Sequence, residues 1–473
     1  MNFVKKMSIY KSRFFNFFLY FFLTTFFFTV DAFSEIVWQL PAQQRAASGE
    51  DTSPVIVATD DTGGNVAMIW RNSTDAKIQV VISNNFGSTW SSPIDLSVTP
   101  TAQNSDIAIS SSGQYIYGIW EARPAAIFQI EFSRSTDFGS NWTPTGSVAV
   151  LSDTATNAAR SHVATNSSGS NVYALWRQTV GAKTQIQTSR STDFGATWPA
   201  GTASIKLSEA SENAQLSQIV TNNSGQYVYA VWRRQDGGIF RVQTSRSIDF
   251  GASWTPIASV NTISANDNNA TDPQIATSFS GQFVYGVWEK TVDGSNTNIQ
   301  FSRSTDFGAT FSTAINVVSS IGQARDPKIA IDATGQYVYL VYSVGNSTIR
   351  VSRSTDFGAT FSDPITISTG SSNTMFEITA NVSGQKIFVI WTNSDSLFSK
   401  FVGSSFDFGE TFSDPVLLSG AADSFTQPAI ITDNSGRFVY SAFDLDDGSN
   451  IIIFSVNGVD QTILRVPIAH ITR

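Results

Sequence analysis

Residues 217–232 read SQIVTNNSGQYVYAVW, and the same outline returns at 273–288 (PQIATSFSGQFVYGVW) and 327–342 (PKIAIDATGQYVYLVY). Five further copies begin at Pro54, Ser105, Ser161, Phe376 and Pro428, so the eight starts are 51, 56, 56, 56, 54, 49 and 52 residues apart. A period of this length indicates a solenoid or a propeller. Each copy holds two β-rich runs around a Ser/Gly turn, which predicts a hairpin.

A third and a fourth strand complete each unit. After a variable loop comes an alternating run such as IQFSRSTDFGATF (299–311), with a tight turn and a short strand behind it. Four antiparallel strands per unit predict the blade of an all-β propeller rather than a helical solenoid. Eight hairpins can be counted, so we expect eight blades; seven blades with an appended terminal hairpin is the alternative. A positive φ is expected at the recurrent turn glycines Gly113, Gly169, Gly225, Gly281, Gly335, Gly384 and Gly436.

The turn between the third and fourth strands is the most specific motif of the chain. It reads SNNFGSTW at 83, STDFGSNW at 135, STDFGATW at 191, SIDFGASW at 247, STDFGATF at 304 and 354, and SFDFGETF at 405. These segments resemble the Asp box, S-x-D-x-G-x-T-W, of bacterial sialidases and other BNR-repeat propellers. The resemblance implies that the boxes lie on the face away from the active site.

The chemistry of the box predicts a structural role. An Asp in a turn accepts hydrogen bonds from nearby backbone N–H groups, as in an Asx turn. We therefore assign this role to Asp137, Asp193, Asp249, Asp306, Asp356 and Asp407. The closing aromatic residues are expected to fill space between blades; they are Trp90, Trp142, Trp198, Trp254, Phe311, Phe361 and Phe412. The arginines of the repeated Ser-Arg-Ser are assigned to blade structure; they are Arg134, Arg190, Arg246, Arg303 and Arg353.

The eighth unit departs from the pattern because it has no Asp box. Its third run, residues 451–456, is followed by Asn457-Gly458, which predicts a two-residue hairpin turn and a last strand at 462–468. A further strand is expected before the first unit, at residues 36–40. Either segment could close the ring, since propellers often build one blade from both ends of the chain.

The first 32 residues predict a signal peptide. Lys5, Lys6, Lys11 and Arg13 precede a Phe-rich run over residues 14–30, and Val30-Asp31-Ala32 supplies a cleavage site after Ala32. The alternative is an uncleaved membrane anchor. We expect a secreted or periplasmic protein with one propeller domain over residues 33–473, whose units start near 54, 105, 161, 217, 273, 327, 376 and 428. The chain has no Cys, which excludes a lipoprotein anchor and disulfides.

The charge balance limits the partners. Without residues 1–32 the chain carries 25 basic and 37 acidic residues, a net charge of −12. Nucleic acid would be repelled, and we expect a glycan or an extracellular protein surface as partner of a monomer without a stable membrane anchor after cleavage. His162 and His470 are the two histidines of the chain. No cofactor and no metal site are expected.

The resemblance to sialidases implies an arginine cluster, a Tyr nucleophile paired with Glu, and a general acid. The family's Phe/Tyr-Arg-Ile-Pro motif is missing, because the first strand of the first unit reads PVIVAT. The tyrosines recur at repeat positions, which favours packing. We therefore assign no catalytic residue.

Charged residues outside the repeat collect where second strands end and first strands begin, on the face opposite the boxes. The basic ones are Arg71, Arg123, Arg160, Arg177, Arg233, Arg234 and Arg325, and the acidic ones are Glu121, Asp272, Glu289 and Asp326. Arginine suits bidentate recognition of carboxylate or sulfate, although charged loop residues are usually only solvated. Two functions follow: a non-catalytic glycan- or protein-binding propeller, which the near-identical blades favour, and alternatively a sialidase-like exo-glycoside hydrolase for sialylated or other acidic glycans.

Overall fold

The computed structural model describes residues 32–38, 43–44, 52–72, 74–98, 101–318, 323–345, 347–368, 373–394, 398–419, 427–446 and 451–464. The predicted signal peptide therefore lies outside the described residues except for Ala32. The chain divides into two compact units, Trp38–Val459 on the one hand and Met1–Val37 with Asp460–Arg473 on the other. All eight repeats start in the first of these units. Among the described residues, no helix has the length and apolarity needed to cross a membrane.

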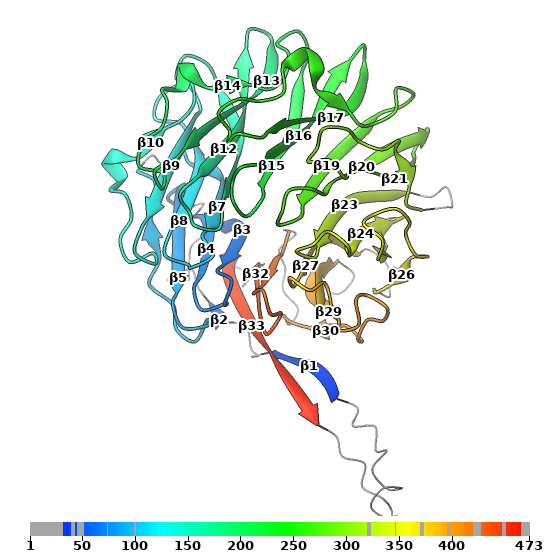
Figure 1. Cartoon of the computed structure of the whole chain (residues 1–473). Coiled ribbons are helices and arrows are strands. Elements are labelled where there is room, and N and C mark those ends of the chain that lie inside the picture. The colour runs from blue at the N-terminus through cyan, green and yellow to red at the C-terminus, as the bar shows by residue number, and fades with distance from the viewer. Residues whose placement is uncertain are drawn as a thin grey trace, which may run out of the picture. The chain divides into compact units, whose positions relative to one another are not determined.

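Seven sheets of the larger unit are four-stranded and antiparallel (Figure 1). Their first strands are β3 (Thr52–Thr59), β7 (Gln103–Ile109), β11 (Ala158–Thr165), β15 (Ala214–Thr221), β19 (Ala270–Thr277), β23 (Ala324–Ile331) and β27 (Asn373–Ala380). The second strands are β4 (Val66–Asn72), β8 (Ile116–Ala122), β12 (Val172–Val180), β16 (Val228–Asp236), β20 (Val284–Asp293), β24 (Val338–Val344) and β28 (Ile387–Asn393).

The third and fourth strands complete these seven blades. The third strands are β5 (Lys77–Ser83), β9 (Gln129–Ser135), β13 (Lys183–Ser191), β17 (Ile239–Ser247), β21 (Asn296–Ser304), β25 (Thr348–Ser354) and β29 (Ser399–Ser405). The fourth strands are β6 (Ile94–Asp95), β10 (Ala149–Val150), β14 (Ile205–Lys206), β18 (Asn261–Thr262), β22 (Ile315–Asn316), β26 (Ile365–Thr366) and β30 (Val416–Leu417). Short 3₁₀ turns precede three of them: η1 (Thr145–Ser147), η2 (Gly201–Ala203) and η3 (Ile257–Ser259).

The number of blades differs from the expectation. The structure shows seven four-stranded blades, which is the alternative, and the prediction of eight such blades is not supported. The eighth hairpin, β31 (Ala429–Thr432) and β32 (Phe438–Asp446), belongs to a five-stranded sheet with the order β1-β33-β32-β31, in which β2 also pairs with β33. The added strands are β1 (Ala32–Trp38), β2 (Gln43–Gln44) and β33 (Ile451–Leu464).

This hairpin closes the ring between the last and the first blade. The Tyr440 hydroxyl donates a hydrogen bond to the Gly63 carbonyl at 2.6 Å, and the Asn434 N–H donates to the Asp61 carbonyl at 3.1 Å. The predicted turn at Asn457-Gly458 is wrong, because β33 runs straight through it and Gly458 pairs with Val439 of β32. Continuous pairing with β32 satisfies the backbone there without a turn.

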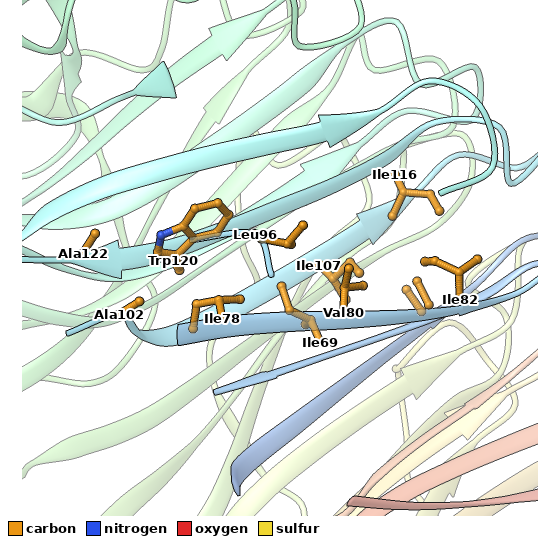
Figure 2. Packing of buried hydrophobic residues seen from close by; sticks show 12 residues of the cluster. Ile69, Ile78, Val80, Ile82, Leu96, Ala102, Ile107, Ile116, Trp120 and Ala122 are labelled. Carbon is orange, nitrogen blue, oxygen red and sulfur yellow. The ribbon is translucent and has the colours of Figure 1, made fainter. Parts of the chain in front are cut away.

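The apolar core is divided among the contacts between neighbouring blades. In the cluster of Figure 2, Ile69, Ile78 and Val80 of the first blade pack with Ile107 and Trp120 of the second. A tryptophan within the second strand recurs as a fully buried residue in six blades, at Trp70, Trp120, Trp176, Trp232, Trp288 and Trp391. Each blade thus buries its apolar face only against its neighbours, which explains why the repeat must continue around the ring.

The aromatic residues that close the Asp-box segments pack as predicted. All seven are partly buried against these clusters: Trp90, Trp142, Trp198, Trp254, Phe311, Phe361 and Phe412. The seven predicted turn glycines also have positive φ, between 66° and 83°. These two features were readable from the repeat because each depends on local spacing alone.

Each turn between third and fourth strands is held by its Ser and by an Asp, or by Asn85 in the first blade. In the fifth blade Asp306 Oδ1 accepts from the Thr310 N–H at 2.9 Å, and Asp306 Oδ2 accepts from the Thr310 hydroxyl at 2.7 Å. The Gly308 N–H donates to Ser304 Oγ at 2.9 Å. The turn places Phe307 as well as Gly308 at positive φ, 59° and 72°, which costs a non-glycine residue about 1 kcal/mol.

Two repeated side chains tie each of the second to sixth blades to the blade that follows it. The Arg246 guanidinium donates to the Phe307 carbonyl at 2.7 Å, and Arg134, Arg190, Arg303 and Arg353 make the equivalent bond. The Tyr229 hydroxyl donates to the Gly281 carbonyl at 2.6 Å. Tyr117, Tyr173, Tyr285 and Tyr339 repeat this bond. These groups therefore serve the connections between blades.

Candidate functional site

The charged candidates lie at one end of the blades. Hairpin turns and Asp-box turns share the opposite end, because the Phe194 N–H of one turn donates to the Ser170 carbonyl of the other at 3.1 Å. In an antiparallel blade, the starts of the first strands and the loops after the second strands must then lie together at the other end. We call this end the loop face.

A β-bulge marks the start of each first strand on the loop face. Register shifts occur there in all seven blades. In six of them a residue other than glycine has a φ between 46° and 56°; these residues are Asn104, Arg160, Leu216, Asp272, Asp326 and Met375. Such a backbone is unfavourable for Arg160, Leu216 and Met375 and easier for Asn and Asp, and bulges commonly re-aim side chains near functional sites.

Between the second and third blades, Glu121 holds two of these bulges together. Its side chain is only 2% exposed. Oε1 accepts from Asn104 Nδ2 at 2.8 Å and from the Arg160 N–H at 2.6 Å, while Oε2 accepts from Gln103 Nε2 at 3.0 Å. The carboxylate is thus occupied by three donors, one of which fixes the strained backbone of Arg160.

Two arginines stand beside this carboxylate without a bonded partner. Ala159, the residue before exposed Arg160, pairs with Arg177 of β12. Burial, and after it the charge of Arg160, lowers the pKa of half-buried Arg177. In the described part of the chain, neither guanidinium makes a hydrogen bond or an ion pair. These two guanidinium groups, whose like charges act on each other, can present five N–H donors each to an anion.

Between the fifth and sixth blades the same backbone positions carry three carboxylates. Glu289 replaces Glu121, Asp272 replaces Asn104, and Asp326 replaces Arg160, and oxygens of the three groups lie within 4.8 Å of one another. The Asp326 N–H is 3.4 Å from Glu289 Oε2. Burial, with the charges of Asp272 and Asp326, raises the pKa of Glu289 to about 7.

This triad has two chemical possibilities. A carboxyl group with a pKa near neutrality can give or take a proton. Three carboxylate oxygens at this spacing are also the donor type that hard cations prefer, and among the described residues this is the one such group of acidic or histidine side chains that could hold a metal ion. The sequence predicts no metal site, and from the sequence these three residues are separate candidates.

The remaining candidates have partners of their own. Arg71 Nε donates to the Ala102 carbonyl at 2.9 Å, and exposed Arg123 lies over the Phe128 ring, 5.3 Å from its centroid. Arg233 donates to Thr271 Oγ1 and to Gln215 Oε1, both at 2.7 Å. Arg325 Nη2 is 3.5 Å from the Ser295 carbonyl. These arginines are therefore engaged in positioning neighbouring loops and strands.

Asn104 and Gln103, which orient Glu121, are not among the residues predicted from the sequence. The sequence also does not show that the charged candidates fall into two groups at two different contacts between blades. The signal was present in part, since Asn104, Arg160, Leu216 and Asp272 are 56 residues apart. The residue types at these bulges do not predict a positive φ together, because Asn and Asp favour it whereas Arg160 and Leu216 do not.

Comparisons with known proteins support the fold. No family model and no curated protein matches the chain. A solved polysaccharide lyase, an ulvan lyase bound to -[GlcA(1-4)Rha3S]-, is similar with a TM-score of 0.53 and 10% identity over 80% of this chain and 97% of that chain. This similarity shows the fold alone.

Two sialidases are also among the similar structures. A Hadza microbial sialidase has a TM-score of 0.41 and 12% identity over 92% of this chain and 97% of that chain. The intramolecular trans-sialidase from Ruminococcus gnavus has a TM-score of 0.39 and 12% identity over 78% of this chain and 96% of that chain. At these scores neither structure carries an argument about the function of this chain.

Proposed function

We propose that the protein is a non-catalytic propeller that binds acidic glycans through Arg160 and Arg177 on the loop face. One observation carries this proposal: the charges of the two guanidinium groups act on each other, and neither group has a hydrogen-bond or ion-pair partner among the described residues, although Glu121 bonds to the Arg160 backbone. Glu121 is already occupied by three donors. A carboxylate or sulfate of a ligand would supply the missing acceptors, and Arg is the residue type that binds such groups through two N–H donors.

The regularity of the blades favours binding over catalysis. A sialidase-like nucleophile would require a tyrosine outside the packing positions, whereas the hydroxyls of Tyr117, Tyr173 and four further tyrosines donate to carbonyls of the next blade. Burial raises the pKa of each of these tyrosines. Activation of such a hydroxyl would break a connection between blades.

Acidic glycans are the first ligands to test. The ulvan lyase that shares the fold was solved with a fragment that contains GlcA and Rha3S, and a partner with this charge would also suit the two arginines. In line with this role, we assign the chain to the Asp-box propellers and propose that it is exported, with cleavage after Ala32, and acts as a monomer on a glycan or protein surface outside the cytoplasm. N-terminal sequencing of exported protein that begins at Met1 would refute the cleavage.

The experiment is a glycan array with wild type, Arg177→Ala and the control Arg234→Ala. Arg234 is on the same face, but its guanidinium is paired with Glu209 at 2.8 Å. We expect binding to carboxylated or sulfated glycans that falls about tenfold in Arg177→Ala, changes little in Arg234→Ala, and weakens with salt. Equal losses in the two variants would show that net charge alone, rather than this site, governs binding.

A second function has one observation in its favour. The pKa of Glu289, about 7, suits a general acid, so the loop face could support glycoside hydrolysis as in the alternative prediction. A fluorogenic sialoside and a panel of uronate-containing oligosaccharides test this directly. Turnover that is abolished in Glu289→Gln would replace the binding function by the hydrolase.

A further inference from the structure

A pocket lies away from the loop face, beside the turns between third and fourth strands of the first two blades. It has a volume of about 340 Å³, and its lining includes Ile82, Asn84, Asn85, Thr89, Trp90 and Phe138. Two aromatic side chains, two amides and three hydroxyls, those of Thr89, Ser91 and Ser140, thus line one cavity, and no lining residue carries a charge. The volume is within the range of pockets that take small ligands.

The first of the seven turns differs chemically from the other six. It carries Asn85 where they carry Asp. Oδ1 of Asn85 accepts from the Thr89 N–H at 2.9 Å, which fixes the orientation of the amide, so Nδ2 donates to Thr89 Oγ1 at 2.8 Å. In the fifth and sixth blades the corresponding bond runs the other way, because Thr310 and Thr360 donate their hydroxyl hydrogens to Asp.

Reversal of this bond leaves donors available at the pocket. The Thr89 hydroxyl hydrogen has no acceptor among the described residues, and neither does the second hydrogen of Asn85 Nδ2. The negative charge of the other six turns is also absent. Asn85 and Thr89 therefore offer neutral hydrogen-bond donors, whereas in the turns of the third to seventh blades the Ser or Thr hydroxyl at the position of Thr89 donates to the Asp.

Phe138 is likewise an exception to the repeat. In five of the seven blades the turn phenylalanine packs against an aromatic residue of the preceding hairpin, as Phe194 does on Tyr115 with centroids 4.5 Å apart, and Phe307 on Tyr227 at 4.6 Å. The equivalent hairpin position for Phe138 is Asn65, and in the described part of the chain no ring stacks on Phe138, which is 40% exposed. Its ring face is available to a ligand.

We propose that this pocket binds a neutral sugar ring, with one apolar face against Phe138 and Trp90 and its hydroxyls at Asn85 and Thr89. A pyranose combines an apolar C–H face with several hydroxyl groups, and it needs no charge on the protein. An aromatic wall beside uncharged donors matches that combination. The site is independent of the arginine site, since it lies at the other end of the blades and uses none of the same residues.

The test is saturation-transfer NMR and titration with the methyl glycosides of galactose, glucose, mannose and N-acetylglucosamine. At least one glycoside should bind wild type with a Kd on the order of 1 mM. Phe138→Ala should weaken it about tenfold or more. Asn85→Asp, which restores the turn of the other blades, should weaken it several-fold while the protein melts at or above the wild-type temperature.

Phe250→Ala is the matched control. Phe250 is 41% exposed and also lacks a stacked ring, because Asn171 takes the hairpin position, but its blade has Asp249 in the turn. Binding should be unchanged in Phe250→Ala. The proposal is overturned if none of the four glycosides binds wild type at about 20 mM, or if Phe250→Ala and Phe138→Ala weaken binding equally.

Discussion

The contact between the second and third blades and the contact between the fifth and sixth use one backbone arrangement for opposite electrostatic results. In each, a Glu follows the buried tryptophan of the second strand and faces a bulge of the next blade. Glu121 meets Asn104, Gln103 and the Arg160 N–H, so its charge is compensated. Glu289 meets Asp272 and Asp326, so its charge is opposed.

The difference shows that the bulge residues set the chemistry of the loop face. The strands, the tryptophans and the bulge positions are nearly the same in both places, whereas the side chains at positive φ change from Asn and Arg to two Asp residues. One contact consequently exposes unpaired arginines, and the other concentrates acid. Variants that exchange these residues should therefore change the charge and the stability of the two contacts.

The largest effect is expected from removing the charge of Glu121. Glu121→Gln places an N–H group among three donors and leaves two arginines without a nearby carboxylate, so the free energy of unfolding should fall by about 2 to 4 kcal/mol. The matched change Glu289→Gln should cost less than about 1 kcal/mol. Urea unfolding at pH 7 measures both, and equal losses would contradict the contrast.

A smaller effect on the free energy of unfolding should come from a change of pH. The pKa of Glu289 is raised from its ordinary value of 4.5 to about 7 in the folded protein, so the folded state binds the proton more tightly than the unfolded state. Its contribution to stability is fully present below pH 4.5 and is lost as the pH rises through 7. After a discount for partial exposure, we expect a loss of about 1 to 2 kcal/mol between pH 5 and pH 8.

The measurement is thermal melting of wild type and Glu289→Gln over this pH range. The difference between the two proteins gives the contribution of Glu289 to the pH dependence of stability. The variant should show a shallower decline from pH 5 to pH 8. Parallel curves would mean that Glu289 titrates as an ordinary exposed carboxyl.

The smallest effect is expected from copying one contact into the other. Asp272→Asn puts an Asn at the position that corresponds to Asn104. Because the new amide should donate a hydrogen bond to Glu289, the free energy of unfolding at pH 8 should rise by about 1 kcal/mol. The reverse change, Asn104→Asp, should lower it by a similar amount. If both variants lose stability at pH 8, the equivalence of the two positions is wrong.

Much of the fold could be predicted from the sequence because its determinants are local and repeated. The hairpins, turn glycines and box aromatics each depend on fixed spacing within one unit, and all are found in the structure. The count of four-stranded blades and the turn at Asn457-Gly458 were wrong because they depend on how the chain ends pair. Pairing of β33 with β32 on one side and β1 on the other overrides a local Asn-Gly preference.

The candidate site could be predicted only in outline. Antiparallel topology was enough to expect the charged residues on one face. It could not show that Glu121 is buried and bonded to the Arg160 backbone 39 residues away, or that three acidic residues converge on one contact. Those facts depend on bulges at non-glycine residues, which hydrophobic periodicity does not reveal.

We infer that the residue at the bulge position decides whether the contact between the second and third blades binds an anion. The variant Arg160→Asp tests this directly. Asp then stands at the bulge of the third blade, as Asp326 does at the equivalent position of the sixth blade. The ligands for isothermal titration are a glucuronate-containing oligosaccharide and its carboxyl-reduced neutral counterpart. Wild type should bind the acidic form alone. The affinity should fall about a hundredfold in Arg160→Asp and change little in Arg234→Asp. Unchanged affinity in Arg160→Asp, or equal binding of the neutral form to wild type, would contradict the claim.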